Sequence, residues 1–250
     1  MVKNDNAFLP IWLKYYSKFF GRDNIYVLDH ESSDGSTDNI DAFCKKEIVH
    51  HPYFSDTWKV GTIMARQKEL LKDHEYVIFT DCDECLAPDP EKFRDLEDFI
   101  IKADKNAYRC KGYEIYHSKD EPSIDLGRPL LRQRKYWYPC LHWNKPLISR
   151  IPLNWIPGFH KTRDLEIAVT EDLLLIHLNR IDHDIRYAKQ LAAAGYKWTE
   201  KDIKNNYGWQ YHITEPSAFD DWFYNLFYNG GISLNKIIPE IIPDKWKNIL

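Results

Sequence analysis

Two carboxylates lie two residues apart, at Asp81 and Asp83, directly after the apolar run 76–80. In an extended backbone, side chains with this spacing point to the same face, here at the carboxyl end of a buried strand. Two carboxylates in such a place repel each other and lose hydration, and a divalent cation relieves both costs. Oxygen ligands favour Mg²⁺ or Mn²⁺, and either ion would also neutralise a diphosphate leaving group as a Lewis acid. The spacing therefore predicts a metal site at Asp81 and Asp83.

Three alternatives for this segment stay open. An acidic strand-to-helix turn would need no ligand, with an aspartate capping the following helix. Aspartyl-nucleophile phosphatases of the haloacid-dehalogenase type also place Asp-x-Asp after an apolar strand, although Cys85 stands where they have Thr or Val. Cys82 and Cys85 form a CxxC, but zinc requires four ligands and the sequence has no second such pair. The metal site is preferred because a buried strand precedes the two carboxylates.

A second polar segment follows the apolar run 25–28. Asp29 can accept hydrogen bonds from ribose hydroxyls or a base N–H. The turn after it, which includes Ser32 and Asp34, offers hydroxyl and backbone N–H groups to a polar ligand. The alternative is an ordinary Asp-Gly turn followed by a capped helix. The segment is therefore a candidate nucleotide site that depends on what lies beside it.

The elements expected to position these residues alternate along the first hundred residues. Apolar spacing predicts helices over 7–20 and 58–71 and strands over 25–28 and 76–80, and Pro90 is expected in the first turn of a helix that reaches Lys102. This alternation predicts an α/β fold with a mainly parallel central sheet flanked by helices. Beyond Ala107 we expect strands over 108–117, 130–131, 147–148 and 173–178, and helices over 182–194 and 217–228.

Composition narrows the class of protein. The 250 residues are 44% hydrophobic and 29% charged with a net charge of −4, which fits one globular domain and does not indicate a nucleic-acid surface. Five cysteines, an odd number, and no recognisable secretory signal favour reduced thiols and a cytoplasmic location. No apolar run approaches the roughly 18 residues of a membrane helix. The aromatic segments 222–224 and 227–228 are expected in the core, with an interface or a peripheral membrane contact as the alternatives.

Four segments, in their order and spacing, resemble glycosyltransferase family 2 and its relatives of GT-A fold. They are Met-Val-Lys-Asn-Asp, Phe-Leu-Pro-Ile-Trp-Leu, Tyr-Val-Leu-Asp-His-Glu-Ser-Ser-Asp-Gly-Ser-Thr-Asp and Phe-Thr-Asp-Cys-Asp-Glu-Cys-Leu, all within residues 1–100. The resemblance implies a Rossmann-like half that binds a nucleotide sugar over 1–105. It also implies an acceptor-binding half of mixed α+β structure with C-terminal helices over 106–250, in the same single domain. In this fold a strand precedes Lys3-Asn4, so here that strand is either very short or lies upstream of Met1.

The resemblance implies metal-dependent transfer of a sugar from a nucleotide-diphosphate sugar, UDP-linked by family default. The acceptor would be a glycan or another hydroxyl compound, and the transfer would proceed with inversion. Val2 and Asn4 resemble the end of the first strand, which lines the base pocket. Asp29 resembles the carboxylate that holds the base or ribose, with Ser32 and Asp34 in the adjoining turn.

Further residues are expected around the diphosphate. The resemblance places Arg66 in the helix that approaches the donor, although Gln67 stands where the family has Asn. Asp81 resembles the carboxylate near the ribose and metal, and Asp83 the direct ligand of Mn²⁺ or Mg²⁺. Lys145, in a segment rich in cations and aromatic residues, is a candidate diphosphate or acceptor contact, with a solvated surface cation as the alternative.

The second half is expected to supply a third metal ligand and a general base. His160 and His177 could each add an imidazole ligand, and His160 is preferred because the preceding Pro-Gly places it on a turn. An inverting transfer requires a carboxylate that takes the proton of the acceptor hydroxyl. The expected bases are Asp172, which is preferred, and Glu171, with Asp125 and Glu114 as rivals. The alternative for the whole chain is a non-catalytic nucleotide- or carbohydrate-binding module of the same fold.

Overall fold

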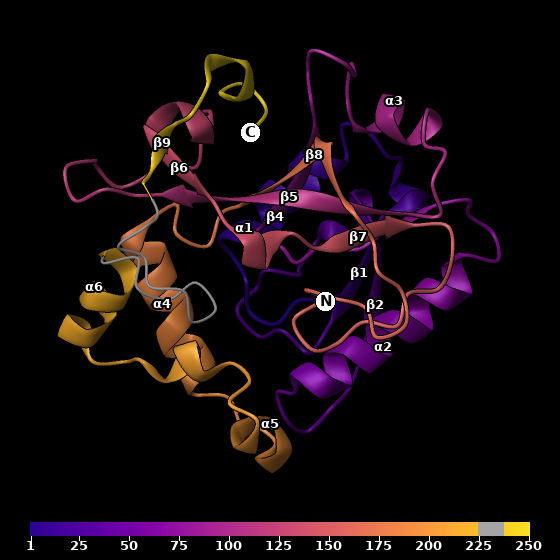
Figure 1. The fold of residues 1–250 in the computed structure, drawn as a ribbon. Coiled ribbons are helices and arrows are strands. Elements are labelled where there is room, and N and C mark those ends of the chain that lie inside the picture. The colour runs from indigo at the N-terminus through magenta and orange to yellow at the C-terminus, as the bar shows by residue number, and fades with distance from the viewer. Residues whose placement is uncertain (225–237) are drawn as a thin grey trace.

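A computed structural model describes residues 1–224 and 238–250 and shows a mixed α/β architecture (Figure 1). Within this part of the chain the strands form two sheets. The smaller pairs β1 (Tyr26–Asp29) with β2 (Lys45–Ile48) in parallel. The larger contains β3 (Val77–Ile78), β4 (Glu84–Pro88), β5 (Ala107–Tyr116), β6 (Tyr136–Pro139), β7 (Pro146–Ser149), β8 (Val169–His177) and β9 (Glu240–Ile241).

The larger sheet is mostly antiparallel, so the prediction of a mainly parallel central sheet is wrong. Its order is β3-β7-β5-β6-β9, with every neighbouring pair antiparallel, and β8 lies between β4 and β5. β8 is antiparallel to β4 and parallel to β5. The reason is that β5, β6 and β7 follow one another with no crossover α-helix, and parallel neighbours need such a crossover. Strands from both halves of the chain, such as β4 and β8, share this sheet.

The α-helices of the described residues are α1 (Phe8–Tyr16), α2 (Asp56–Leu70), α3 (Leu96–Ile101), α4 (His183–Ala194), α5 (Glu200–Lys204) and α6 (Pro216–Tyr224). A side-chain cap begins four of them, α2 to α5. The predicted helix over 182–194 is confirmed, because the Asp182 carboxylate accepts from two backbone N–H groups at its start and Gly195 ends it. The predicted helix at Pro90 is wrong: residues 84–88 form β4, and α3 begins only after its cap at Asp95. Residues 130–131 lie in a 3₁₀ turn, not in a strand.

The last part of the predicted helix over 217–228 lies outside the described residues. Within α6, Phe219, Trp222 and Phe223 are buried together, so this part of the aromatic segment packs inside the molecule as expected. Figure 1 shows α4, α5 and α6 grouped together, with α5 beside the start of α2, where the Thr57 hydroxyl donates to the Asp202 carboxylate at 2.8 Å. None of the helices in the two described ranges is both long and apolar enough to cross a membrane.

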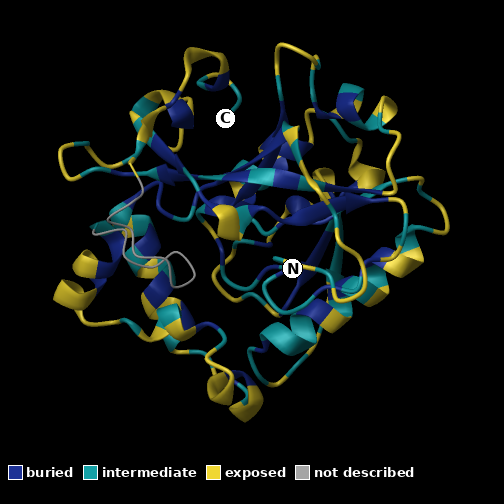
Figure 2. Ribbon diagram, viewed as in Figure 1, coloured by how far each residue is buried: buried dark blue, intermediate teal, exposed yellow. Residues whose placement is uncertain are grey.

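The core lies where β4 and β8 meet, as the dark blue strands at the centre of Figure 2 show. All of β4 is buried, and so are residues 173–177 of β8. α1 packs against this layer and anchors it through two phenols. The Tyr15 hydroxyl donates to the Leu86 carbonyl at 2.7 Å, and the Tyr16 hydroxyl donates to the Glu84 carbonyl at 3.2 Å. The backbone that follows Asp81 and Asp83 is therefore tied to the centre of the fold.

Candidate functional site

A charged cavity of about 110 Å³ lies where four segments of the chain meet. These are the N-terminal loop, the start of α2, the connection from β3 to β4, and α4. Each contributes a charged side chain, and aromatic side chains complete the wall. The charged residues that line the cavity are Lys3, Asp5, Lys59, Asp81, Asp83 and Lys189, and the aromatic ones include Trp58, Tyr196 and Tyr211.

Two lysines neutralise the carboxylates of this cavity. Lys59 Nζ lies 2.5 Å from Asp81 Oδ1. Lys189 Nζ lies 2.8 Å from Asp5 Oδ2 and 3.2 Å from Asp83 Oδ2. Burial opposes the ionisation of Asp83. Attraction first to Lys189 and then to His177 outweighs the effect of burial and lowers the pKa of Asp83 to about 2. Burial likewise opposes ionisation of Asp81, yet Lys59 and Lys145 hold its pKa well below the usual range. Both carboxylates are therefore anionic at neutral pH.

Glu84 fixes the turn that carries Asp81. The backbone N–H of Asp81 donates to Glu84 Oε2 at 3.1 Å, and the N–H of Glu84 donates back to the Asp81 carbonyl at 3.1 Å. Lys145 Nζ lies 2.5 Å from Glu84 Oε1, with side-chain exposures of 4% and 0%. Lys145, expected to contact the diphosphate, is thus buried behind the Asp81 turn and does not line the cavity. From this position Lys145 supports the turn that carries Asp81.

His177, not His160, reaches the carboxylate pair. The strand register places His177 of β8 between Glu84 of β4 and Glu114 of β5. His177 Nε2 lies 4.0 Å from Asp83 Oδ1, and His177 Nδ1 lies 2.7 Å from Glu114 Oε2. Opposite charges on both sides outweigh the effect of burial and raise the pKa of His177. A buried histidine thus lies between the Asp83 and Glu114 carboxylates, and it does not itself line the cavity.

The His160 ring lies elsewhere, against aromatic neighbours. Its Nδ1 is 2.8 Å from the His142 carbonyl oxygen, and its ring centroid is 3.6 Å from that of His142. Burial, followed by repulsion from Lys145, lowers the pKa of His160 to about 2, so the ring is neutral. His160 does not line the charged cavity.

Val2 and Asn4 line the cavity. Asn4 has a positive φ of 52°, a conformation that asparagine tolerates better than most residues. Its N–H donates to Ser32 Oγ at 3.0 Å, and its Oδ1 accepts from the Ser33 N–H at 2.7 Å. The N-terminal loop and the turn after β1 are therefore joined directly.

The Asp29 carboxylate is used inside the protein. It is buried, accepts from the Ser32 N–H at 2.8 Å and accepts from the Thr37 hydroxyl at 2.7 Å. Asp34 is exposed and accepts from the Ser36 N–H at 3.0 Å, so it too shapes this turn. Neither carboxylate lines the cavity. Their contribution in this structure is to hold the turn that meets Asn4.

Arg66 and the expected bases lie away from the cavity. Arg66 forms ion pairs with Glu47 and Glu69 on the outer part of α2. Glu171 and Asp172 lie at the amino end of β8, where each forms an ion pair 2.5 Å long, with Lys111 and Lys92 respectively. At about 3.3 Å per residue, they are on the order of 17 Å along the strand from its end at residue 177. Of the two rival carboxylates, Asp125 lies in an exposed turn. The other rival, Glu114, lies nearer to the cavity, where its carboxylate contacts His177.

Sequence reasoning missed Asp5, Lys59 and Lys189. A lysine in a helix reads as a solvated surface residue, and nothing local shows that a carboxylate distant in sequence will cover it. Lys59 carried one signal, because it lies in the first turn of a helix next to an expected strand end. Lys189 carried none, since its partners Asp5 and Asp83 are 184 and 106 residues away.

The arrangement does not form a metal centre as it stands. Among residues 1–224 and 238–250, no group of three or more His, Cys, Asp or Glu side chains is placed to hold a metal ion. Asp81 and Asp83 face separate lysines instead of one common point. The binding of Mn²⁺ or Mg²⁺ therefore stays a prediction.

Comparison of the chain with protein-family models, with curated proteins and with solved structures finds no match. The resemblance to family 2 glycosyltransferases thus depends on the four sequence segments alone. What the chain does must be argued from the cavity itself.

Proposed function

We propose that the charged cavity binds the diphosphate of a nucleotide-diphosphate sugar and that the protein transfers the sugar to a hydroxyl acceptor such as a glycan. One observation carries the proposal: Lys59 and Lys189 lie in the same small cavity as the Asn4 loop and the two carboxylates. Ammonium groups bind phosphate strongly through charge-assisted hydrogen bonds. A diphosphate, with more charge than one carboxylate, can compete for both lysines.

The chemistry that follows is a displacement at the anomeric carbon. The acceptor oxygen forms the new glycosidic bond while the bond to the diphosphate oxygen breaks, and the proton of the acceptor hydroxyl passes to water. Lys59 and Lys189 stabilise the negative charge that develops on the leaving diphosphate. Trp58, Tyr196 and Tyr211 offer faces for the sugar or the base.

The size of the cavity sets a requirement on this proposal. Its volume of about 110 Å³ is below the usual range for small-molecule sites, which is about 300–1,000 Å³. Lys59 and Lys189 must therefore turn away from Asp81 and Asp83 for a whole nucleotide sugar to enter. The GT-A architecture is part of the same proposal, supported by the parallel arrangement of Val2, β1 and β2.

The test is a binding panel of UDP, GDP, CDP and TDP, each with Mn²⁺ or with EDTA, read by thermal shift and calorimetry. A ligand at a hundred times its Kd stabilises the folded state by about 2.7 kcal/mol. We expect Lys59→Met and Lys189→Met to weaken binding of the preferred diphosphate at least about tenfold, the loss of one charge-assisted contact. Lys92→Met, which removes an equally short pair with Asp172 on the surface, is the matched control.

The outcomes separate the proposals. Binding in EDTA that depends on both lysines supports charge neutralisation by the lysines, whereas binding only with Mn²⁺ and lost in Asp83→Asn supports the metal prediction. No shift with any diphosphate, or equal binding by Lys59→Met and wild type, contradicts the proposed function.

A non-catalytic binding module is the second candidate, because the expected bases Glu171 and Asp172 lie away from the cavity. A nucleotide-sugar assay decides between them: release of the nucleoside diphosphate supports the transferase, and binding without release supports the module. Turnover of an aryl phosphate that depends on Asp81 would instead support a phosphatase.

A further inference from the structure

A buried arginine, Arg186, lies on α4 nearly one turn before Lys189. Arg186 is 1% exposed, yet its Nε and Nη1 atoms have no hydrogen-bond partner within residues 1–224 and 238–250. Burial lowers the pKa of Arg186. Residues 225–237, which lie outside the described ranges, contain no Asp or Glu to serve as its counter-ion. A cation that is costly to bury is thus left without the partner that usually compensates for burial.

Two aromatic rings flank the guanidinium of Arg186. Its Cζ atom lies 5.2 Å from the centre of the Tyr211 ring and 5.1 Å from the centre of the Trp222 ring. Contacts of this kind stabilise the charge and leave N–H groups for an acceptor. Arg180 holds Trp222 in place, because its Nη1 donates to the Trp222 carbonyl at 2.9 Å and its Cζ lies 4.4 Å from the ring centre. Packing therefore fixes Arg186 in a position where an oxyanion would complete its hydrogen bonds.

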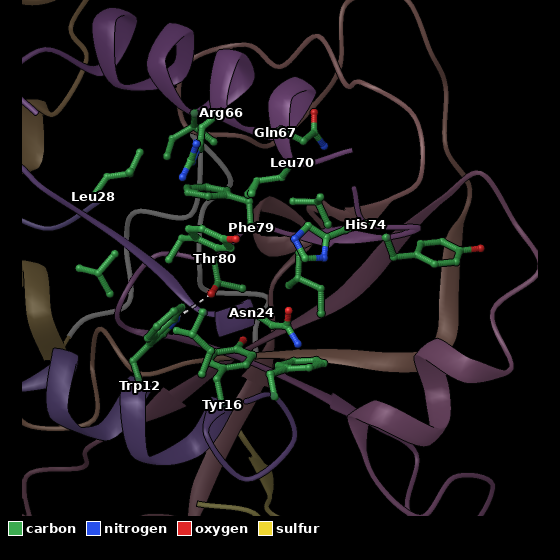
Figure 3. A pocket seen from close by; sticks show the side chains of 18 of the residues that line it. Trp12, Tyr16, Asn24, Leu28, Arg66, Gln67, Leu70, His74, Phe79 and Thr80 are labelled. Atoms are coloured by element: carbon green, nitrogen blue, oxygen red, sulfur yellow. Dashed lines mark hydrogen bonds between the residues drawn. The ribbon is translucent and has the colours of Figure 1, made fainter. Parts of the chain in front are cut away.

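Other arginines in comparable surroundings have carboxylate partners. Arg66 lies beside the apolar cavity of about 430 Å³ that Figure 3 shows, with its Cζ 4.9 Å from the centre of the Tyr26 ring. It forms two ion pairs. Arg134 is 2% exposed, and its Nη2 lies 3.3 Å from the Asp182 carboxylate. Arg186 differs from both because its guanidinium is both buried and unpaired, which indicates a ligand contact.

The order of residues along α4 places Arg186 relative to the charged cavity. Just after this helix, the Tyr196 hydroxyl donates to the Lys3 carbonyl at 3.3 Å, so this end of α4 meets the N-terminal loop. Lys189 lies two turns earlier, and Arg186 lies about 4.5 Å further along the axis. In the proposed function the nucleotide lies near the N-terminal loop and the diphosphate at Lys189. Arg186 therefore lies beyond the diphosphate, on the side of the transferred sugar and the acceptor.

Tyr211 separates the guanidinium of Arg186 from this cavity. The ring of Tyr211 flanks Arg186, and the same residue lines the charged cavity and is partly exposed. The Gln190 amide holds the turn that carries Tyr211, through the carbonyls of Gln210 and Ile213. The backbone of the turn is thus bonded to α4, and rotation of one side chain is enough to open a path to the guanidinium.

We propose that Arg186 binds an oxyanion, a carboxylate or a phosphate, that is carried by the transferred sugar or by the acceptor, after the Tyr211 side chain turns aside. The guanidinium fork matches the two oxygens of such a group. The charged side chains that line the cavity, three lysines and three aspartates, balance one another, so Arg186 adds a positive charge that no side chain offsets. The substrate class is therefore an acidic or phosphorylated sugar or acceptor. The assignment to sugar or acceptor rests on the proposed function, whereas the oxyanion site itself does not.

The experiment uses inorganic phosphate as the probe, titrated by calorimetry into wild type, Arg186→Met and the control Arg134→Met. We expect Arg186→Met to bind phosphate at least about tenfold more weakly, the loss of one charge-assisted contact. Its Tm should equal or exceed that of the wild type, because an unpaired buried charge is removed. The Tm of Arg134→Met should fall by about 6–20 °C, because a buried pair is broken. Equal phosphate affinity in Arg186→Met and wild type overturns the proposal, and so does a fall in Tm as large as that of Arg134→Met.

A second measurement on the wild-type protein keeps the proposal testable if Arg186→Met does not fold. The Nε–H resonance of Arg186, assigned with Arg186→Lys, should shift as phosphate is added, with its midpoint at the Kd from calorimetry. No shift of this resonance at saturating phosphate overturns the proposal.

Saturating UDP separates the two sources of an oxyanion. Phosphate that still binds and shifts the Arg186 resonance in the presence of UDP supports a site beyond the diphosphate. Displacement of phosphate by UDP, with the same shift caused by UDP itself, would assign Arg186 to the diphosphate and overturn the choice of sugar or acceptor.

The same titrations distinguish failure of this inference from failure of the proposed function. Phosphate binding at Arg186 without binding of any nucleoside diphosphate supports the oxyanion site and contradicts the proposed function. Binding of a diphosphate through Lys59 and Lys189, with no phosphate at Arg186, supports the proposed function and overturns this inference.

Discussion

Replacement of Lys145 by methionine tests whether a buried ion pair supports the Asp81 turn. The Lys145 ammonium lies 2.5 Å from Glu84, and the two side chains are 4% and 0% exposed. Methionine keeps most of the apolar volume but leaves the Glu84 carboxylate buried without its cation. Removal of one partner of a buried pair costs about 3–5 kcal/mol, compared with about 0–1 kcal/mol for an exposed pair.

The expected effect is a large fall in Tm. For a chain of this size, 1 kcal/mol corresponds to about 2–4 °C, so Lys145→Met should lower the Tm by about 6–20 °C. The assay is urea unfolding at pH 7, followed by tryptophan fluorescence and circular dichroism, with thermal scans alongside. The double variant Glu84→Gln with Lys145→Met should recover at least about half of the loss, because it removes the uncompensated charge. The side-chain carbonyl of the introduced glutamine can still accept from the Asp81 N–H.

The control is Lys92→Met. Lys92 forms a pair of the same 2.5 Å length with Asp172, but the Lys92 side chain is 58% exposed. The Tm of Lys92→Met should therefore stay close to that of the wild type. Equal losses in Lys145→Met and Lys92→Met would refute the reasoning, since burial would then make no difference. No recovery in the double variant would refute it as well. If Lys145 is a support, nucleotide affinity of the folded fraction should also fall less in Lys145→Met than in Lys189→Met.

Two further predictions concern close packing and pH. A Cβ on Gly112 would lie 2.3 Å from Trp143 Cβ, so Gly112→Ala should cost roughly 1–3 kcal/mol of unfolding free energy. The control Gly61→Ala meets nothing within 4 Å inside α2 and should be neutral or stabilising, and equal stability of both variants would contradict the close approach. Desolvation lowers the pKa of His183, but its two carboxylate partners outweigh this and raise it. The Tm of wild type should therefore exceed that of His183→Gln by the largest margin below the unfolded pKa of about 6.5. This margin should shrink as pH rises through the raised pKa of His183. A constant difference in Tm from about pH 5.5 to 9 would count against this.

Elements with local signals were predictable, whereas strand partners were not. The helix over 182–194 has its cap and its glycine stop within the same stretch of sequence, and these signals do not depend on the rest of the fold. Residues 173–178 were recognised as a strand from their apolar run. That run says nothing about β4 on one side or β5 on the other. Direction and neighbour depend on distant segments, and for this reason the parallel sheet was wrongly predicted.

The carboxylates of the cavity were predictable in place but not in their partners. Asp81 and Asp83 follow the expected strand, although β3 covers only Val77–Ile78 and is half-buried instead of buried. Val2 and Asn4 line the same cavity. The lysines that neutralise the carboxylates could not be inferred, because burial of a lysine against a distant carboxylate leaves no mark on its own neighbours in sequence. For the same reason, sequence could not separate residues that face a ligand from residues that support them. Lys145 was expected to face a ligand, yet it lies behind the turn.

The N-terminal loop joins β1 to the charged cavity. Val2 is bonded to β1, and Asn4 is bonded to the turn after β1. Asp5 then pairs with Lys189, which also contacts Asp83. This series of contacts restrains the Lys189 ammonium through the N-terminal loop, and a preorganised site loses less entropy on binding.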